Sequence, residues 1–197
     1  MEVIMIEKEY KIVLTQSEYL TISKKIKFDD IIHQTNYYYD SNTFDLERQG
    51  LTVRVRIIEG KGKWLQVKKK LQNKTDGITI KKEFEEKIGN LPRNIRLNHL
   101  ESLIQESIDT ESRKVVLLGE MTTTRMLSHS NNCEIALDRS EYLGKTDYEL
   151  EIEFEEDADS VKKILKDLKI QGNIKEVGKY RRFLKELKRK IQIENGK

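Results

Sequence analysis

The sequence predicts a β-dominated α+β fold in which about eight strands close into a barrel with helices packed outside it. Two observations predict this fold. In most of the predicted strands charged and apolar residues alternate, so each strand has one charged and one apolar face. The charged faces also carry rows of a single sign, whereas an open sheet usually exposes a mixed polar surface. If the sheet closes, the charged faces line a lumen and the apolar faces pack against helices.

Length and composition limit the classes of protein that need to be considered. A chain of 197 residues is long enough for one domain, and we expect residues 1–197 to form one. Charged residues make up 36% and hydrophobic residues 37%, a balance that excludes a disordered chain. The net charge of +3 gives no general attraction to nucleic acid, so we expect no DNA partner.

The sequence also indicates the compartment. Cys133 is the one cysteine, which excludes an intrachain disulfide and fits a reducing environment. No run of about 18 apolar residues is present, and the N-terminus lacks the pattern of a signal peptide. We therefore expect a cytoplasmic protein without a membrane partner. The sequence leaves open whether it is a monomer or a homodimer.

The first predicted strand, residues 3–13, carries the row Glu7, Glu9 and Lys11 on one face. Alternate residues of a strand lie about 7 Å apart, so two glutamates could converge on one hard cation while the lysine faces an anion. An isolated row of this kind is more often the wet face of a strand. The recurrence of similar rows further along the chain favours a functional interpretation.

The middle of the chain predicts a basic hairpin and then a mixed strand. Residues 51–58 place Arg54 and Arg56 on one face, and residues 63–70 return with Lys68 among their polar positions. Residues 78–87 follow, with Lys81, Glu83 and Glu85 on one face. Further strands are predicted over 35–40, 113–127 (with Arg125), 133–138 and 147–155, with a polar loop containing Asp76-Gly77 and a turn over 139–144. The predicted helices are a capped helix from Thr15, one or two helices over 92–108, and helices over 161–168 and 179–193.

The strand over 147–155 carries the densest acidic row, which includes Glu149, Glu151 and Glu153. A closed lumen with acidic and basic sectors would be costly to leave dry. It therefore implies water, metal ions and a polyanionic ligand, because carboxylates that hold a divalent cation attract phosphate and the opposite basic wall completes the site.

These rows, in this order, resemble the CYTH domain, the family of triphosphate tunnel metalloenzymes. The resemblance covers nearly the whole chain and implies an eight-stranded antiparallel tunnel that binds a triphosphate with Mg²⁺ or Mn²⁺. The motifs that carry it are Glu7-x-Glu9-x-Lys11, Arg54-x-Arg56, Lys68, Glu83-x-Glu85, Arg125, Asp138 before a Tyr-Leu-Gly turn, Glu149-x-Glu151-x-Glu153 and Gly178-Lys179-Tyr180-x-Arg182.

The resemblance also implies a role for each residue. The metal-binding carboxylates would be Glu7, Glu9, Asp138, Glu149 and Glu151. The phosphate-binding cations would be Lys11, Arg54, Arg56, Lys68, Arg125, Lys179 and Arg182. The residues closest to the chemistry would be Glu7, Glu9, Lys11, Arg54, Arg56 and Arg125, and supporting lumen carboxylates would be Glu83, Glu85 and Glu153.

We therefore expect a metal-dependent hydrolase that removes the terminal phosphoryl group of inorganic tripolyphosphate or of a small organic triphosphate such as thiamine triphosphate. Two alternatives use the same tunnel. One is an adenylate cyclase of the class IV type, in which the ribose 3′-hydroxyl replaces water as the nucleophile. The other is a non-catalytic module that holds polyphosphate or the 5′-triphosphate of RNA, which would need the basic wall but not the metal.

Overall fold

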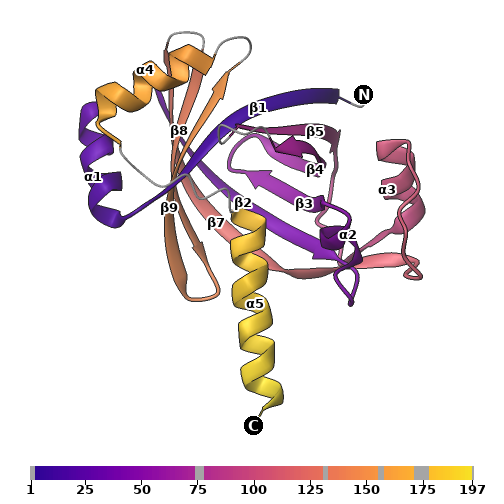
Figure 1. Cartoon of the computed structure of the whole chain (residues 1–197). Helices are drawn as coiled ribbons and strands as arrows, with labels where there is room; N and C mark the ends of the chain where they lie inside the picture. Colours follow the sequence, from indigo (N-terminus) through magenta and orange to yellow (C-terminus); the bar gives the residue numbers. More distant parts are fainter. Residues whose placement is uncertain (1–2, 74–77, 131–132, 155–157, 171–177, 197) are drawn as a thin grey trace.

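The computed structural model describes residues 3–73, 78–130, 133–154, 158–170 and 178–196. The strands are β1 (Val3–Leu14), β2 (Asp30–Asp40), β3 (Leu51–Ile58), β4 (Gly62–Asn73), β5 (Ile78–Lys87), β6 (Asn94–Arg96), β7 (Lys114–Ser130), β8 (Cys133–Tyr142) and β9 (Lys145–Phe154). The helices are α1 (Gln16–Lys25), α2 (Asp45–Arg48), α3 (Leu97–Ile104), α4 (Ala158–Leu168) and α5 (Lys179–Asn195). Their arrangement can be followed in Figure 1.

The strands form one antiparallel sheet that closes on itself. Its order is β2-β3-β4-β5-β1-β9-β8-β7-β6, and a further pairing of β2 with β7 joins the two ends. Eight strands therefore make the barrel, while β6 pairs with β7 at the end of the strand order and is not part of the closed ring. The predicted closed eight-stranded antiparallel barrel with flanking helices is confirmed.

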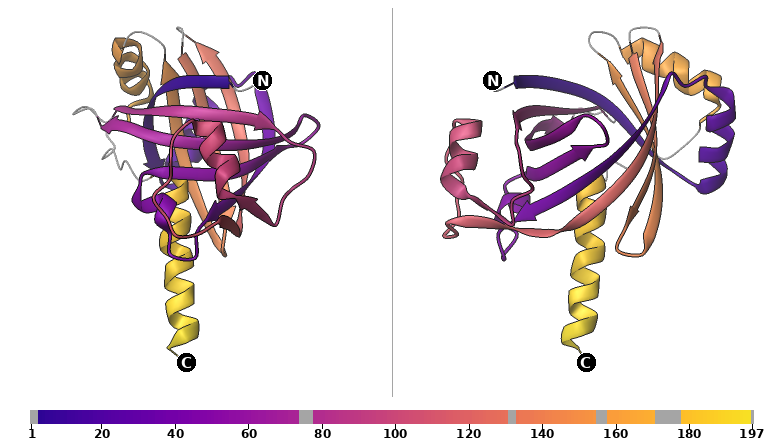
Figure 2. Two further views of the ribbon diagram at one scale, coloured as in Figure 1. Left: turned by 90° about the vertical axis from the view of Figure 1, so that its right-hand side faces the viewer. Right: turned by 180° about the vertical axis from the view of Figure 1, so that it is seen from behind.

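Helices α1 and α4 lie together against one side of the barrel (Figures 1 and 2). Tyr10, Ile12 and Leu14 of β1 point outward here and belong to one buried cluster with Ile22 of α1 and Val161 of α4. Helix α1 begins with the predicted capping box, in which Thr15 Oγ1 accepts from the backbone N–H of Glu18 at 3.2 Å and the Glu18 carboxylate accepts from the Thr15 N–H at 2.7 Å. Because side chains alternate along a strand, Glu9 and Lys11 face the inside of the barrel.

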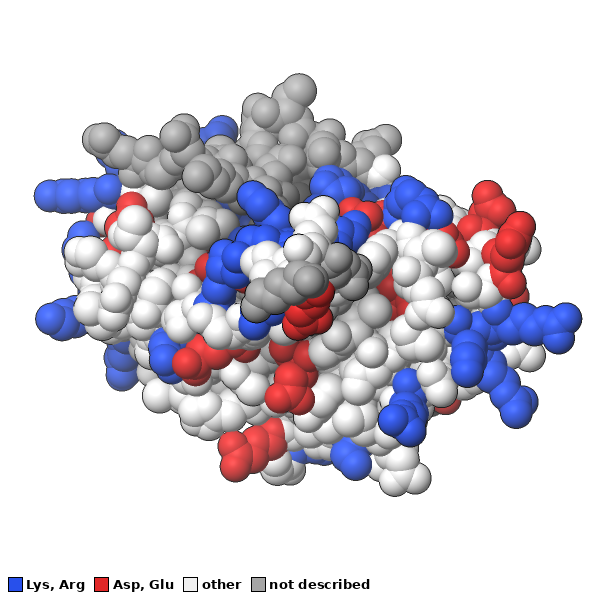
Figure 3. Space-filling model, turned by 90° about the horizontal axis from the view of Figure 1, so that it is seen from below, with Lys and Arg blue, Asp and Glu red and all other residues white. Residues whose placement is uncertain are grey.

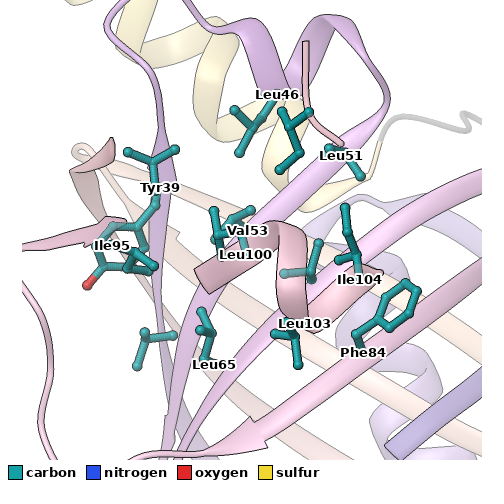
Figure 4. Close-up of a cluster of buried hydrophobic side chains, with 14 residues drawn as sticks. Tyr39, Leu46, Leu51, Val53, Leu65, Phe84, Ile95, Leu100, Leu103 and Ile104 are labelled. Atoms are coloured by element: carbon teal, nitrogen blue, oxygen red, sulfur yellow. The ribbon is translucent and has the colours of Figure 1, made fainter. Parts of the chain in front are cut away.

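Helix α3 covers the opposite side of the barrel (Figure 2). Leu100, Leu103 and Ile104 of α3 are fully buried and pack on the outward side chains of β3, β4 and β5. Figure 4 shows these side chains converging between the helix and the strands. The apolar faces of β3 and β4, the predicted basic hairpin, are thus buried under α3 outside the barrel. Because side chains alternate along a strand, the charged faces of these strands line the inside.

Helix α5 begins at the barrel and its C-terminal end projects away from it (Figure 1). Phe183 is fully buried against Tyr38 and Met121. The ring of Phe183 lies so close to Gly119 in β7 that a Cβ there would come within 3.0 Å of it, and Gly119 has a φ of +151°. The glycine therefore lets the first turns of α5 seat on the barrel.

Four elements differ from the predictions. The segment predicted as one or two helices over 92–108 begins with the short strand β6, and β2 begins at Asp30 rather than at residue 35. Strand β8 runs on to Tyr142, so the turn expected over 139–144 narrows to its last residues. Helix α2 was not predicted, because four residues are too few to show a helical period. The predicted Asp76-Gly77 turn lies outside the described residues.

Candidate functional site

The interior of the barrel contains a charged cavity of about 150 Å³, well above the roughly 10–15 Å³ that a site needs to hold one water. Among the residues that the structure describes, nine Lys or Arg and four Glu line it, so positive charge is in excess within this described lining. Side chains from most of the barrel strands, from the α2–β3 turn and from the start of α5 contribute. The lining charged residues are Glu9, Lys11, Glu47, Arg54, Arg56, Lys68, Lys70, Lys81, Arg125, Glu151, Glu153, Lys179 and Arg181.

The carboxylates gather on three neighbouring strands. Strand pairing sets Asp138 of β8 opposite Glu149 of β9, and Glu9 of β1 opposite Glu153. Asp138, Glu149 and Glu151 each offer an oxygen within 4.8 Å of the others, and so do Glu9, Glu151 and Glu153. Glu151 belongs to both groups. All five except Glu153 are buried.

The ammonium group of Lys179 lies at the centre of the first carboxylate group. Its Nζ is 2.8 Å from Asp138 Oδ2 and 2.5 Å from Glu151 Oε1, and it also contacts Glu149 Oε1. Lys179 is the first residue of α5, so the position of this helix decides where the charge is placed. The oxygens of Asp138, Glu149 and Glu151 therefore already surround one positive charge, the Lys179 ammonium.

Arg125 of β7 joins the same carboxylates from the other side. Its Nε and Nη2 donate to the two oxygens of Asp138 at 2.9 and 2.7 Å, a bidentate pair, and Nη2 also donates to Glu151 Oε2 at 2.5 Å. Arg182 of α5 donates to Glu149 Oε2 at 2.7 Å and to Asp147 Oδ2 at 2.8 Å. Guanidinium groups from β7 and from α5 thus bind the carboxylates of β8 and β9 from two sides.

Two lysines share Glu9. Lys11 Nζ lies 2.8 Å from Glu9 Oε2 and 2.6 Å from Glu151 Oε1, so it bridges the two carboxylate groups. Lys81 of β5 contacts the other oxygen of Glu9. Both oxygens of this buried carboxylate are therefore paired with ammonium groups.

The opposite wall is formed by β3, β4 and β5. Lys68 Nζ lies 2.8 Å from Glu83 Oε2. Arg54 Nε donates to Gln66 Oε1 at 2.8 Å, and Gln66 in turn donates to Glu85 Oε2 at 2.5 Å. The Arg54 Nη2 atom is buried, lies 3.9 Å from Glu83 Oε1, and makes no hydrogen bond to a described residue. A buried guanidinium nitrogen without a hydrogen bond is costly, so this corner favours an anion with acceptor oxygens.

Arg56 extends this corner. Its Nε donates to Asn36 Oδ1 at 3.0 Å, and within the described part of the chain the buried Nδ2 of Asn36 has no partner either. Burial and the neighbouring guanidinium groups of Arg54 and Arg125 lower the pKa of Arg56. Three guanidinium groups therefore repel one another here, and a bound polyanion would relieve the repulsion.

The ionisation of the carboxylates follows from their partners. Burial acts to raise the pKa of Glu151, but Lys11, Lys179 and Arg125 outweigh it and hold that pKa well below the ordinary value. The pKa of Asp138 is lowered for the same reason, by Arg125 and Lys179. Glu149 differs, because burial raises its pKa and Glu151 adds to the rise. Asp138 and Glu151 are thus held as anions beside a glutamate that takes up a proton more readily.

Most of the residues predicted from the sequence meet in this one place. Lys11, Arg54, Arg56, Lys68, Arg125 and Lys179 line the cavity together with Glu9, Glu151 and Glu153. Asp138 and Glu149 lie behind Lys179, Arg182 binds Glu149 from the outside, and Glu83 and Glu85 join the basic wall. Glu7 lies in β1 opposite Lys81, but its side chain is outside the described residues.

Lys81 was missed as a site residue, although its strand pattern already placed it on the face of Glu83. Burial and the charge of Lys11 lower the pKa of Lys81 to about 8. Asn36 and Gln66 were missed as well, because amides on a polar strand face carry no signal of their own. The ion pairs between predicted metal ligands and predicted phosphate ligands were also not foreseen.

The amino-acid sequence is similar to a known family and to a known protein. The family model "CYTH domain" matches residues 5–184. A protein of Bacillus subtilis (strain 168), named "Putative triphosphatase YjbK", is 27% identical over 164 residues, which are 75% of this chain and 77% of that protein.

Two solved structures share the fold. One from Hippeastrum, described as a "putative adenylyl cyclase HpAC1" with "a dominant triphophatase activity", has a TM-score of 0.70 and 22% identity, and covers 91% of this chain and 95% of its own. Another from Bacillus halodurans, described as a "putative adenylate cyclase", has a TM-score of 0.69 and 23% identity, and the match covers 91% of this chain and 98% of the other. Since the family model spans most of the sequence and the barrel carries its charged rows inside, this chain belongs to the CYTH domain family.

Proposed function

We propose that this protein is a divalent-metal-dependent triphosphatase that hydrolyses the terminal phosphoryl group of a small triphosphate inside the barrel. One observation carries the proposal: Glu9, Glu151 and Glu153 line a cavity together with many Lys and Arg residues, and Asp138 and Glu149 lie directly behind Lys179 of that lining. Acidic groups alone would repel phosphate, and basic groups alone would bind it without a reason to bury carboxylates beside them. Membership of the CYTH family and the names of the relatives support the same reaction.

The carboxylates fit a hard divalent cation. Mg²⁺ and Mn²⁺ prefer oxygen ligands, and Asp138, Glu149 and Glu151 offer three within 4.8 Å of one another. The contact of Lys179 with all three indicates that this group of oxygens stabilises positive charge. We propose that these residues, together with Glu9 and Glu7, hold the ion. Once bound, Mg²⁺ or Mn²⁺ would supply charge that polarises the phosphoryl oxygens and activates water.

The chain's own cations bind and orient the phosphates. Arg54 and Arg56 present guanidinium groups whose planar donors match phosphate oxygens, and Arg54 Nη2 has no hydrogen-bond partner among the described residues. Lys11, Lys68 and Arg125 add charge along the cavity, where they stabilise the negative charge that develops on the leaving diphosphate. Lys179 and Arg182 would act from α5, with Glu83, Glu85 and Glu153 neutralising the basic wall.

The alternative reaction is cyclisation of ATP, which the descriptions of the two structural relatives raise. A cyclase must place the ribose and base as well as the phosphates. The aromatic residues of the described cavity lining are Tyr38 and Tyr180, and both are buried in the packing of α5. Because neither ring is open to stack on a base, the lining favours selection by the phosphate chain over selection of adenine.

The test is a substrate panel on the purified full chain. Tripolyphosphate, thiamine triphosphate, ATP and RNA 5′-triphosphate are each incubated with Mg²⁺ or Mn²⁺ in ¹⁸O-labelled water. Hydrolysis places the label in orthophosphate and leaves a diphosphate product. Conversion of ATP to cyclic AMP and pyrophosphate, with tripolyphosphate untouched, would replace this proposal by the cyclase, and tight binding without turnover would replace it by a binding module.

A further inference from the structure

Two buried amide side chains hold the arginines of β3 from its two neighbouring strands. Strand pairing sets Asn36 of β2 directly opposite Arg56, and Asn36 Oδ1 accepts from Arg56 Nε at 3.0 Å. On the other side, Gln66 of β4 is directly opposite Arg54, and Gln66 Oε1 accepts from Arg54 Nε at 2.8 Å. Opposite residues of an antiparallel pair have Cβ atoms about 5 Å apart, so each amide reaches its arginine. Each guanidinium group is thus fixed through its Nε.

The orientation of both amides follows from their neighbours. The Nε of an arginine can only donate, so the oxygen of each amide must face it and the amide nitrogen must point elsewhere. Gln66 Nε2 donates to Glu85 Oε2 at 2.5 Å, which holds this side chain in place. Asn36 is 1% exposed, and its Nδ2 has no hydrogen-bond partner among the described residues. A buried donor without a partner is costly, which indicates that the site requires the other half of this amide, the acceptor for Arg56.

Arg125 and Arg182 are held by carboxylates instead. Arg125 donates to both oxygens of Asp138 at 2.9 and 2.7 Å, and Arg182 donates to Glu149 at 2.7 Å. A carboxylate orients a guanidinium group and also balances its charge, whereas an amide oxygen orients it without carrying a charge. The arginines of β3 therefore keep positive charge that those of β7 and α5 share with carboxylates of the protein.

The carboxylate of Glu83 does not balance this charge. Glu83 Oε1 lies 3.9 Å from Arg54 Nη2, which is too far for a hydrogen bond, while Glu83 Oε2 lies 2.8 Å from Lys68 Nζ. Arg56 forms no ion pair with another residue of the described ranges. Both guanidinium groups line the cavity. Two fixed guanidinium groups with unbalanced charge are preorganised for the oxygens of an anion.

We propose that Asn36 and Gln66 are positioning residues, which orient Arg56 and Arg54 for the substrate and leave the charge of both guanidinium groups available to its phosphates. The inference rests on the proposed function and adds two residues that act on the phosphates through the arginines. A carboxylate in place of either amide would give the same orientation but a weaker attraction for phosphate.

The experiment separates orientation from charge at Asn36. Asn36→Asp keeps the acceptor oxygen and replaces Nδ2 by an oxygen, and the new carboxylate should be ionised beside Arg56. Asn36→Leu has a similar volume, removes the acceptor and leaves the charge of Arg56 unopposed. For each variant, kcat/KM for tripolyphosphate with Mn²⁺ is measured over a series of ionic strengths. Lys and Arg also gather on the surface around α5 (Figure 3), so each ionic-strength dependence is compared with that of the wild type.

Both variants should lower kcat/KM about tenfold or more, the effect expected when a hydrogen bond to a charged group is lost or its charge is balanced. Only Asn36→Asp should make the dependence on ionic strength shallower, because only this variant removes net positive charge from the site. Asn98→Asp is the matched control, since it adds the same charge at an exposed position of α3 outside the barrel and should change neither quantity. A wild-type rate and ionic-strength dependence in Asn36→Asp would overturn the proposal.

Double-mutant cycles test whether the amides act through the arginines. Asn36→Leu should cause no further loss in an Arg56→Ala background, and Gln66→Met, which keeps the length of the side chain, should cause none in an Arg54→Ala background. Fully additive losses would contradict a positioning role. Urea denaturation establishes that each variant is folded, and the Gln66→Met cycle decides the outcome if Asn36→Leu is not.

A binding measurement keeps the two proposals separate. Affinities for tripolyphosphate, determined by calorimetry in EDTA, should fall in the same variants and show the same pattern with ionic strength. Absence of tripolyphosphate turnover by the wild type would overturn the proposed function, and the affinities in EDTA would still decide the role of Asn36 and Gln66. Turnover by the wild type with unchanged affinities in Asn36→Asp, Asn36→Leu and Gln66→Met would overturn the positioning role alone.

Discussion

The hydroxyl of Tyr180 in α5 donates a hydrogen bond to Asp40 Oδ2 at 2.8 Å. Asp40 is completely buried at the end of β2, where its oxygens also accept from the backbone N–H groups of Leu46 and Glu47 at the start of α2. The pair thus joins α5, α2 and the barrel at the rim of the cavity. Lys179 precedes Tyr180 in the same turn, so we expect this hydrogen bond to position the Lys179 ammonium.

Replacing this hydroxyl should weaken both the fold and the site. Tyr180→Phe removes a hydrogen bond to a buried carboxylate, which should cost about 2 kcal/mol of unfolding free energy in urea denaturation. We also expect a fall in kcat/KM, because Lys179 loses its anchor. Tyr39→Phe is the control, since it removes a buried hydroxyl bond to the Pro92 carbonyl on the far side of the barrel wall. It should lose stability without the change in kcat/KM, and equal activity in the two variants would contradict the positioning role.

Lys179 and a divalent ion should compete for the same oxygens. Lys179→Met removes the ammonium from Asp138, Glu149 and Glu151, so the affinity for Mn²⁺ without substrate should rise about tenfold. The turnover of tripolyphosphate should nevertheless fall, because Lys179 is one of the proposed phosphate-binding cations. Calorimetric titration with Mn²⁺ and steady-state kinetics measure the two effects.

Lys185→Met is the matched control for that experiment. Lys185 lies on the exposed side of the same helix, and its replacement should change neither the affinity for Mn²⁺ nor turnover. A weaker affinity for Mn²⁺ in Lys179→Met would contradict the assignment of these carboxylates as the metal site.

Arg54 should contribute to the preference for a triphosphate over shorter phosphates. Arg54→Ala removes a buried guanidinium group whose Nη2 has no hydrogen-bond partner in the described residues, so KM should rise and kcat fall together. A loss of about 10²-fold in kcat/KM is expected, the order found when one donor to developing charge is removed. Competition assays should also rank tripolyphosphate above pyrophosphate and orthophosphate for the wild type. The exposed Arg93→Ala serves as the control, and equal inhibition by the three anions would argue against a linear site.

Acid should destabilise the metal-free protein. The folded-state pKa values of Glu9, Asp138 and Glu151 are lowered, so their contribution to stability is present above the ordinary carboxyl pKa of about 4 and is lost as the pH falls through the folded-state values. The raised pKa of Glu149 acts in the opposite direction and offsets part of this loss. In EDTA, Tm should therefore drop steeply below about pH 4.

The comparison for the acid experiment is Glu9→Gln, which should show a shallower dependence of Tm on pH. Glu59→Gln changes an exposed carboxylate in the β3–β4 turn and should follow the wild type. Parallel curves for the wild type and Glu9→Gln would show that the buried ion pairs of Glu9 do not contribute to the acid sensitivity.

Much of this site could be predicted from the sequence because a strand has a period of two. The alternation around Arg54 and around Glu151 determines which side chains face the lumen once the sheet closes. The period does not reveal the register between strands, which is why the contacts of Lys81 with Glu9 and of Lys179 with Asp138 were not foreseen. Those pairs depend on the register of each strand relative to its neighbour and on the position of α5 against the barrel.

The most direct test of the central claim is the release of orthophosphate from tripolyphosphate by the wild type and by Glu151→Gln, each with Mn²⁺ and with EDTA. Glu151 belongs to both carboxylate groups, so its neutralisation should affect every proposed metal position. We predict metal-dependent release by the wild type, a loss of about 10²-fold or more in Glu151→Gln, and no loss in Glu59→Gln. Metal-independent release, or wild-type rates in a folded Glu151→Gln variant, would contradict the account.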